Sequence, residues 1–520
     1  MERKLPLGMQ SFEKIREEDC LYVDKTEQIW KLANCGRQYV YLSRPRRFGK
    51  SLLVDTLQCY FEGRKELFEG LKIMDLEKDW VKRPVVRLDM SRGGANTQTL
   101  RSYLNICFSR YEEEYGITPP ATAQLADRFD GIISTAYKQT GQKVAILIDE
   151  YDSPLQHSWK TPEHEACTEV YREVFAILKA DDAYEKFVFI TGITKLTQLS
   201  LFSVLNNLTN ISFLPEYTSL CGITEEEIST NFGPELEKMG EQNGWTLEET
   251  RSRLKGYYDG YHFSRQIHPD IYNPFSLISA LSTGELLNYW ASSGSTSLLP
   301  KFITDAEIRM RDFDNCRVLR DKLETSDVTG GGPELFLYQC GYLTIKRYDE
   351  FGYVLGFPNA EVRQALYDMV LPILTLRREG ETQSTQANLY YQLGTCQVPE
   401  AMKSLKALIA DTPYSNKKLA SMDMEERYRL IVSTILNAIG LQVGVERPLA
   451  NGRIDIVAQT SRYVYILELK LSKNGGVKAA EKQILENQYI EPFKASGRKA
   501  VGLAIELDDL GKGLIDWKEV

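Results

Sequence analysis

Four short apolar runs mark the first third of the chain, and polar, helix-like segments separate them. The runs are QYVYL (38–42), PVVRLDM (84–90), VAILIDE (144–150) and KFVFITG (186–192). Continuous apolar strands that alternate with helices are typical of a parallel sheet covered by helices on both faces. Ligands of such sheets gather at the carboxyl ends of the strands. The pattern therefore predicts an α/β domain over residues 1–215, with its site at that edge.

The hydrophobic pattern changes in the rest of the chain. We expect a helical lid or winged-helix-like region over residues 216–380. Near its start, GITEEEIST (222–230) has a threonine before three glutamates, as at a capped helix start. Residues 381–421 have the pattern of a helical linker. Residues 422–520 run helix, hairpin, helix and strand, which predicts a separate small α/β domain.

Composition and charge narrow the class of protein. The chain has 520 residues and a net charge of −9, which argues against a wholly basic nucleic-acid wrapper. Its nine cysteines form no C-x-x-C pair, so we expect free thiols in a reducing compartment. The start, MERKLPLGM, is not a signal peptide, and no window has about 18 uncharged apolar residues. These features predict a cytoplasmic protein with no membrane partner.

The stretch SRPRRFGKS (43–51) follows the first apolar run and precedes a helix-like segment. It matches the second half of a phosphate-binding loop, G-x-x-x-x-G-K-[ST], through Gly49, Lys50 and Ser51. In such a loop backbone N–H groups surround the phosphates, the lysine reaches the β and γ oxygens, and the serine holds Mg²⁺. Arg44 stands where the first glycine is expected, and it restricts the positive φ that glycine allows.

Two acids end the third apolar run. A magnesium-dependent ATPase needs a carboxylate at the end of a nearby strand to hold the metal, and a second acid beside it can polarise the attacking water. VAILIDEYD supplies Asp149 for the first role and Glu150 for the second. An acidic strand end that meets solvent is the alternative, but its combination with the GKS sequence favours an ATPase.

Polar residues at the end of the fourth run give a third part of this site. Thr191, Thr194 and Lys195 are placed to sense the γ-phosphate, and helix capping is the alternative for the threonines. For Arg46 and Arg47 two interpretations stay open, either added charge around the triphosphate or contact with DNA. The residues expected to bind the nucleotide are Arg46, Arg47, Phe48, Gly49, Lys50, Ser51, Leu52 and Lys195.

Taken together, SRPRRFGKS, IDEYD and TGITKLTQLSLFSVLNNL resemble the AAA-ATPase-like family of prokaryotic proteins. Members of that family are similar to additional-strand ATPases such as AAA+ and STAND proteins. The resemblance covers most of residues 1–290 and implies ATP and Mg²⁺ as cofactors on a P-loop sheet of the additional-strand type. Because RPRRFGKS is the usual form of the loop in the family, it also implies that Arg44 is a family variant.

The second informative stretch is NGRIDIVAQTSRYVYILELKLSK (451–473), which contains two β-rich runs. A tight hairpin turning about residues 461–462 would place Asp455 opposite Glu468, and Lys470 would project from the same face. Both faces of this hairpin are apolar, so an edge hairpin with exposed acids is the poorer explanation. A sheet keeps two such acids together when a divalent cation bridges them.

Metal-assisted phosphodiester hydrolysis fits this arrangement. Asp455 and Glu468 would hold Mg²⁺, while Lys470 would orient the water or neutralise the developing charge. An aspartate followed by Glu-x-Lys on the next strand resembles the PD-(D/E)XK nuclease superfamily, over roughly residues 420–520, although the proline of the motif's name is absent. The resemblance implies a glutamine on the following helix, which matches Gln483. It also implies a glutamate on the preceding helix, and spacing does not decide between Glu425 and Glu426.

Two hypotheses of function follow. In the first, an ATPase gates a Mg²⁺-dependent nuclease-like domain that acts on nucleic acid, with DNA favoured, in DNA processing or defence. In the second, a nucleotide-dependent switch or assembly module carries a domain that binds nucleic acid without cleaving it. Either protein could form a homo-oligomer. The segment GYYDGYHFS (256–264) predicts an aromatic core more readily than a nucleic-acid stacking platform.

Overall fold

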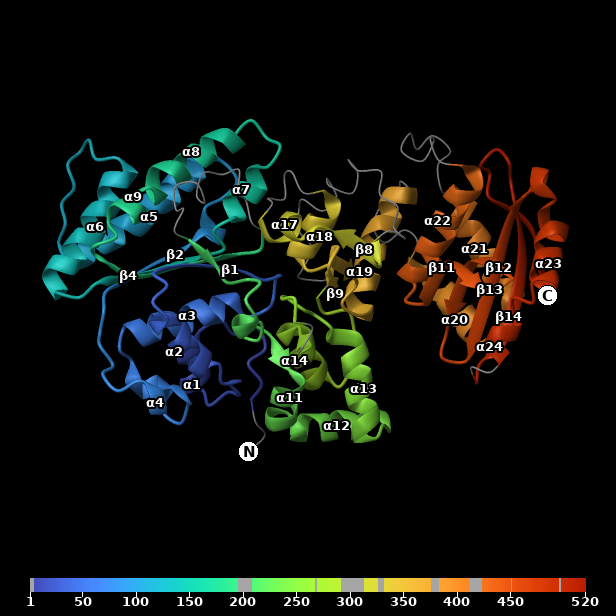
Figure 1. Cartoon of the computed structure of the whole chain (residues 1–520), viewed down its shortest axis with the longest axis horizontal. Coiled ribbons are helices and arrows are strands. Elements are labelled where there is room, and N and C mark those ends of the chain that lie inside the picture. Colours follow the sequence, from blue (N-terminus) through green and yellow to red (C-terminus); the bar gives the residue numbers. More distant parts are fainter. Residues whose placement is uncertain are drawn as a thin grey trace. The chain divides into compact units, whose positions relative to one another are not determined.

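The computed structural model of this chain contains two compact units (Figure 1). The first comprises Met1–Leu298 and Asn315–Asn359, and the second comprises Leu299–Asp314 and Ala360–Val520. Within them, the residues that the structure describes are 4–194, 208–266, 269–290, 313–325, 332–375, 383–410, 423–449, 451–494 and 497–520.

A five-stranded parallel sheet forms the centre of the first unit, in the order β2-β3-β4-β1-β5. Its β4 lies between β1 and β3, which is the arrangement of an additional-strand ATPase and confirms the predicted fold class. The four apolar runs match four of the strands closely, whereas the two-residue β5 was not predicted from the sequence. The strands are β1 (Tyr39–Ser43), β2 (Val85–Asp89), β3 (Val144–Asp149), β4 (Glu185–Gly192) and β5 (Thr209–Asn210).

Helices cover both faces of this sheet, because its strands are apolar on both sides (Figure 1). Those on one face are α5 (Thr97–Tyr115), α6 (Leu125–Thr140), α8 (His164–Phe175) and α9 (Ile177–Ala180). Those on the other are α1 (Phe12–Glu17), α2 (Thr26–Asn34), α3 (Lys50–Phe61) and α4 (Ile73–Leu76). The short α7 (Ser153–Ser158) follows β3.

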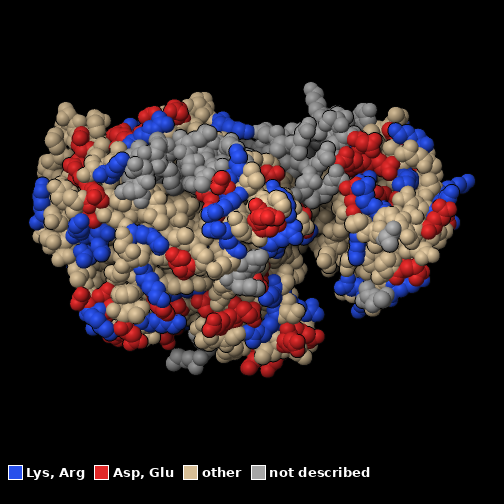
Figure 2. Space-filling model, viewed as in Figure 1, with Lys and Arg blue, Asp and Glu red and all other residues tan. Residues whose placement is uncertain are grey.

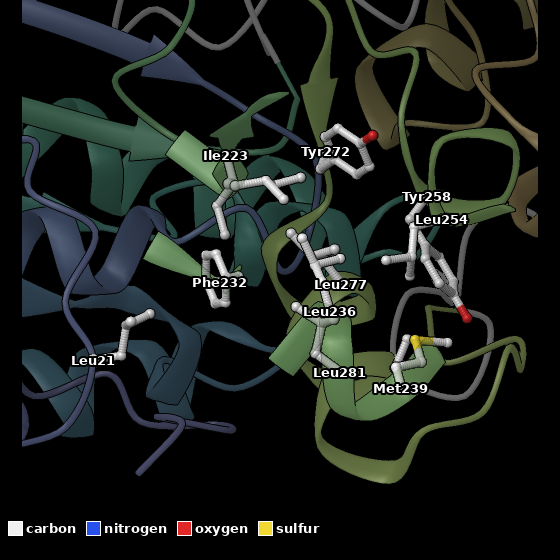
Figure 3. Packing of buried hydrophobic residues seen from close by; sticks show 12 residues of the cluster. Leu21, Ile223, Phe232, Leu236, Met239, Leu254, Tyr258, Tyr272, Leu277 and Leu281 are labelled. Atoms are coloured by element: carbon white, nitrogen blue, oxygen red, sulfur yellow. The ribbon is translucent and has the colours of Figure 1, made fainter. Parts of the chain in front are cut away.

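Four helices and a two-stranded ribbon form the first part of the middle region. Thr224 caps the first helix reciprocally with Glu227, as the sequence predicts. A buried apolar cluster joins these helices to Leu21 of the amino-terminal segment (Figure 3). The elements are β6 (Ile223–Thr224), α11 (Glu225–Asn231), α12 (Gly233–Asn243), α13 (Leu247–Tyr258), β7 (Ile271–Tyr272) and α14 (Pro274–Thr283).

A three-stranded antiparallel sheet with two helices completes this unit. Its strand order is β8-β10-β9, which together with the element order is the topology of a winged helix, as expected for the middle region. Residues 335–340 of α18 are all buried, and Tyr338 stacks on Phe213 at 6.0 Å between ring centroids. The elements are β8 (Cys316–Val318), α17 (Arg320–Thr325), α18 (Pro333–Cys340), β9 (Thr344–Asp349) and β10 (Gly352–Gly356).

The second unit is a mixed sheet with flanking helices. The sheet order is β11-β12-β13-β14-β15, with β13 and β14 parallel and the other pairs antiparallel. Pairing of Ile456 with Leu467 confirms the predicted hairpin register. The helices are α19 (Ala360–Thr375), α20 (Gln383–Gly394), α21 (Val398–Ala410), α22 (Met424–Ala438), α23 (Gly476–Glu486) and α24 (Glu491–Lys494). The strands are β11 (Gln442–Leu449), β12 (Gly452–Gln459), β13 (Tyr463–Leu471), β14 (Lys499–Leu507) and β15 (Leu514–Glu519).

The charged side chains and the helix lengths add two observations. Acidic and basic side chains are interspersed over the face shown in Figure 2. In the described part of the chain, every helix is too short or too polar to cross a membrane.

Candidate functional sites

A cavity of about 520 Å³ opens at the carboxyl ends of β1, β2 and β3. This volume lies in the range of small-molecule sites, about 300–1,000 Å³. The phosphate-binding loop and the two predicted acids line one part of the cavity, and the segment 6–10 with the start of α14 lines another. The first apolar run, the GKS sequence and the acidic strand end therefore converge, although they are far apart in the sequence.

The phosphate-binding loop turns sharply before α3. Gly49 has a φ of 89° and precedes the first residue of the helix, so the positive end of the helix dipole faces the cavity. Arg47 has a φ of 66°, so a second left-handed residue bends the loop. Lys50 is almost fully buried, and its Nζ donates to Pro45 O at 3.2 Å and forms an ion pair with Glu150 at 3.5 Å.

Arg44, the residue in place of the first glycine, is turned into the protein interior. It is 1% exposed, and its guanidinium donates to Ser212 O and Tyr217 O at 3.0 Å each. The guanidinium also lies 4.1 Å from the ring centroid of Phe263. Burial lowers the pKa of Arg44 to about 10, which still leaves it charged near neutral pH.

The segment 256–264 holds the other end of the same loop. Phe48 packs edge-to-face against Tyr261 and Phe263, with ring centroids 4.8 and 5.4 Å apart. Phe48 O accepts a hydrogen bond from Gly222 N at 3.2 Å. Tyr261 and Phe263 are buried, which confirms the interpretation of this segment as an aromatic core. Both ends of the phosphate-binding loop are thus mounted on residues that lie far beyond it in the sequence.

The predicted metal and water residues lie together beside Lys50. Asp149 is 2% exposed and takes a hydrogen bond from the Ser51 hydroxyl. Burial and the neighbouring Glu150 raise the pKa of Asp149 to about 6. Glu150 has a φ of 48°, and its backbone N donates to Asp149 Oδ1 at 3.0 Å. A hydroxyl and a carboxylate side by side are the oxygen ligands that Mg²⁺ takes from nucleotide-binding proteins.

The other residues predicted to contact the nucleotide do not all line the cavity. Arg46 and Leu52 line the cavity, and the Arg47 guanidinium lies 4.7 Å from the ring centroid of Phe275. Thr191 is fully buried. Lys195 lies outside the described residues.

Asp152, which sequence reasoning did not select, anchors the end of β4. It is fully buried, and the Thr194 hydroxyl donates to its Oδ2 at 2.6 Å. The backbone N of Thr194 donates to the same oxygen at 2.6 Å, and the backbone N of Ile193 donates at 3.1 Å. The IDEYD sequence gave a sign of this role, because the residue is a third acid in the same turn. Thr194 therefore braces the end of β4 through Asp152.

A smaller, apolar pocket of about 100 Å³ adjoins this cavity. The two share Pro6, Leu52, Pro274 and Ile278, and the smaller pocket extends toward Leu21 and residues near Cys221. Aromatic bases bind in apolar sites of this kind, whereas triphosphates need the positive end beside Lys50. The combined space therefore has one polar and one apolar end.

The predicted acids of the second unit also lie together. Asp455 and Glu468 occupy opposed positions of β12 and β13 and are 8% and 0% exposed. Burial, and next the charge of Asp455, raise the pKa of Glu468 to about 7. Asp455 Oδ2 accepts a hydrogen bond from Leu469 N at 3.0 Å. Lys470 Nζ donates to Glu468 Oε1 at 2.9 Å, so the three predicted residues form one cluster.

Glu425, one of the two candidate glutamates of α22, contacts this cluster. Glu425 Oε1 lies 3.5 Å from Lys470 Nζ, and Asn474 Nδ2 donates to Glu425 Oε2 at 3.0 Å. Burial would lower the pKa of Lys470, but Glu468, Asp455 and Glu425 outweigh it and raise that pKa. Glu425 is thus the glutamate that reaches the cluster through Lys470.

Glu468 also offers a test of whether the cluster suits a metal ion. Its Oε2 is buried and has no hydrogen-bond partner among the described residues. A buried carboxylate oxygen without a donor is costly unless a cation or water satisfies it, so the donor set fits a divalent ion. Across the described residues, no group of three or more acids, histidines or cysteines is arranged to hold a metal, so water or substrate must complete any such shell.

The side chain of Gln483 is held by a tyrosine that also contacts β12. Its Nε2 donates to Tyr489 Oη at 3.2 Å. Tyr489 Oη in turn donates to Arg453 O at 3.0 Å and accepts from Arg453 N at 3.2 Å. Gln483 therefore supports β12 two residues before Asp455.

Two further charged residues, which sequence reasoning missed, adjoin these acids. Arg429 Nε lies 3.1 Å from Asp455 Oδ1, and Arg429 Nη1 donates to Glu446 Oε1 at 2.6 Å. The only sequence sign of Arg429 is its spacing of one helical turn from Glu425 on α22.

Comparisons with known proteins agree with both halves of this description. Residues 6–202 match the family model described as a predicted AAA-ATPase. Residues 423–517 match the model of the PD-(D/E)XK nuclease superfamily. The fold and sites thus define a P-loop ATPase-like protein with a carboxy-terminal nuclease-superfamily domain.

One curated relative extends the likeness to almost the whole chain. It is the "Uncharacterized protein in vnfD 5'region" of Azotobacter chroococcum mcd 1, which is 31% identical over 532 residues. The alignment covers 99% of this chain and 98% of the relative. The chain belongs to the predicted AAA-ATPase family and carries a PD-(D/E)XK nuclease-superfamily domain at its carboxy-terminal end.

Proposed function

We propose that this protein binds and hydrolyses ATP with Mg²⁺, and that its nucleotide state gates a Mg²⁺-dependent nuclease-like domain acting on nucleic acid. The observation that carries the first part is the convergence of Lys50, Ser51, Asp149 and Glu150 around one cavity. The second part is supported by the cluster of Asp455 with other charged groups and by the family match of that domain.

In the ATPase site, each side chain has a role suited to its position. Lys50 would exchange Pro45 O and Glu150 for the β and γ oxygens of the nucleotide. Ser51 and Asp149 would hold Mg²⁺, which screens the phosphate charge when bound. Glu150, released from Lys50, would accept a proton from the attacking water. The adenine base of ATP would lie toward the apolar pocket that adjoins the cavity.

Two substitutions test the ATPase assignment. Glu150→Gln should retain ATP binding while the hydrolysis rate falls about 100-fold or more, because it removes a general base. Lys50→Ala should weaken ATP binding about tenfold or more by removing the cation that contacts the phosphates. Fluorescent ATP-analogue titration and phosphate release measure the two quantities, with exposed Glu165→Gln as a control. Unchanged hydrolysis in Glu150→Gln would remove that residue from its role.

In the nuclease-like site, Asp455 and Glu468 would hold Mg²⁺, which supplies an acidified water and screens the scissile phosphate when bound. Lys470 would neutralise charge that develops on the phosphate oxygens, and Glu425 would keep its ammonium in place. We propose DNA as the favoured substrate, a cytoplasmic location and a homo-oligomer as the working assembly. DNA processing or defence would be the setting.

One observation favours the second candidate, a nucleotide-dependent switch with a nucleic-acid-binding domain that does not cleave. Both oxygens of Asp455 are engaged, one by Arg429 and the other by Leu469 N. Cleavage of single- and double-stranded DNA and RNA with Mg²⁺ or Mn²⁺ separates the candidates. Loss of activity in Asp455→Ala and Lys470→Ala supports the nuclease. Nucleic-acid binding with no cleavage to lose supports the switch.

A further inference from the structure

Arg429 lies between two acids that belong to neighbouring strands. Its guanidinium contacts Asp455 Oδ1 of β12 at 3.1 Å and Glu446 Oε1 of β11 at 2.6 Å. The side chain is 12% exposed, so little water separates these charges. Neither acid belongs to the helix that carries the arginine, and the contact therefore joins α22 to two strands of the sheet.

The register of the sheet explains why a cation is needed there. Glu446 lies between Val445 and Arg447, whose partners on β12 flank Asp455. Asp455 and Glu468 each lie one residue beyond the pair Ile456–Leu467 of β12 and β13. Three acids therefore form a row across three adjacent strands. Like charges placed directly opposite each other destabilise a sheet. The positive charge of Arg429 balances the negative charges of Glu446 and Asp455. Lys470 lies beside the third acid, Glu468.

The backbone supports the same interpretation. Glu446 has a φ of 50°, a conformation that side chains other than glycine rarely adopt. It interrupts the ladder between the pairs Val445–Ile456 and Arg447–Ile454. Strained backbone persists only where surrounding interactions hold it, and the ion pair of Glu446 with Arg429 is such an interaction. Arg453 adds a second cation at 3.2 Å from Glu446.

We propose that Arg429 is a permanent counter-ion of the metal site. It holds the acids of β11 and β12 together before a divalent ion arrives, and it weakens the binding of that ion by competing for Asp455. The inference rests on the proposed metal-binding role of Asp455 and Glu468. Arg429 is thus a positioning residue that acts through Asp455.

Whether metal binding tightens or weakens when Arg429 loses its charge separates this role from that of a residue that only orients Asp455. A neutral partner that only orients a metal-binding carboxylate strengthens binding, and its loss typically costs 10–100-fold in metal affinity. A fixed cation beside the same carboxylate repels the incoming ion, and this repulsion is little screened in a buried site. Loss of the charge at position 429 should therefore tighten metal binding, by about tenfold.

The test is a titration of the full chain with Mn²⁺ alone, followed by electron paramagnetic resonance of the free ion. Asp455→Asn identifies which binding belongs to this site. Arg429→Gln removes the charge but keeps a hydrogen-bond donor, and Arg429→Lys keeps the charge. We expect Arg429→Gln to bind Mn²⁺ about tenfold more tightly than the wild type, and Arg429→Lys to bind like the wild type. Unchanged or weaker binding in a folded Arg429→Gln overturns the inference.

Two further results keep the outcomes distinct. Glu446→Gln leaves Arg429 to pair with Asp455 alone, so Mn²⁺ binding should weaken, and tighter binding would contradict the proposal. This variant decides the matter if circular dichroism shows that Arg429→Gln does not fold. If the wild type has no Mn²⁺ site that depends on Asp455, the proposed metal site itself fails, and the inference fails with it.

Discussion

Replacing Arg44 by glycine would restore the usual first residue of a phosphate-binding loop, and we expect it to damage this one. The substitution removes the charged donors of Ser212 O and Tyr217 O and leaves two buried carbonyl groups without them. It also removes the guanidinium that lies 4.1 Å from the Phe263 ring centroid. The loop would lose its connection to the segments that follow the sheet.

The magnitude follows from these contacts. Each hydrogen bond from a charged donor contributes about 1.5–3 kcal/mol, and the cation–π contact contributes about 1–2 kcal/mol. Glycine adds about 0.5–1 kcal/mol of backbone entropy cost. The substitution also removes the cost of burying a charge, which offsets about 3 kcal/mol of this loss. That cost follows from burial lowering the pKa of Arg44 from 12.5 to about 10. The free energy of unfolding of the first unit should therefore fall by about 1.5–6 kcal/mol.

Calorimetry of the full chain measures this change in stability. The melting transition of the first unit is identified as the one that ATP shifts to a higher temperature, because a ligand stabilises the unit that binds it. Binding of a fluorescent ATP analogue reports the loop itself and should weaken in parallel. Arg347→Ala, which changes an exposed arginine of the same unit, is the matched control and should alter stability by at most about 0.5 kcal/mol. If Arg44→Gly matches or exceeds the wild type in both measurements, the arginine only occupies the position of a glycine and the reasoning is refuted.

Three other predictions concern acids, of which Glu185 and Asp152 are buried and Glu425 is partly buried. Burial raises the pKa of Glu185 from 4.5 to about 8, so the folded state keeps a proton that the unfolded state releases. Stability should therefore fall as the pH rises from 4.5 to 8. Glu185→Gln should flatten that fall in melting curves taken across the range. Asp152→Asn weakens the anchor of Thr194 and should lower the ATP turnover number more than it raises KM; a change in KM alone would contradict this. Glu425→Gln should reduce metal-dependent cleavage about tenfold or more, because it loosens Lys470, while the neighbouring Glu426→Gln serves as the matched comparison, and equal losses in a cleavage assay would contradict the assignment.

Local patterns predicted the parts of the fold and sites that depend on residues close in the sequence. The four apolar runs gave four strands, and the hairpin turn fixed the opposition of Asp455 and Glu468. The strand β11 was missed because Gly444 and Pro448 interrupt its apolar pattern. Such residues are common at sheet edges, and β11 is an edge strand.

What the sequence could not reveal depends on distant pairings. The partners of Arg44 lie about 170 to 220 positions further along the chain, and no periodicity links them. Arg429 shows the same limit, since its importance follows from acids on two strands that only the folded sheet brings to it. The hydrogen bonds of Gln483 likewise depend on where Tyr489 lies in the folded domain.

The burial of α18 has a consequence for how this protein can meet DNA. In winged-helix proteins that read sequence, the equivalent helix enters the major groove with its polar face outward. Here Leu335 to Cys340 are buried, and the residue that follows, Gly341, lies against Pro45 of the phosphate-binding loop. This helix cannot probe base edges while the first unit stays folded. This winged-helix-like part instead packs against the phosphate-binding loop, so any sequence discrimination would have to arise on other surfaces.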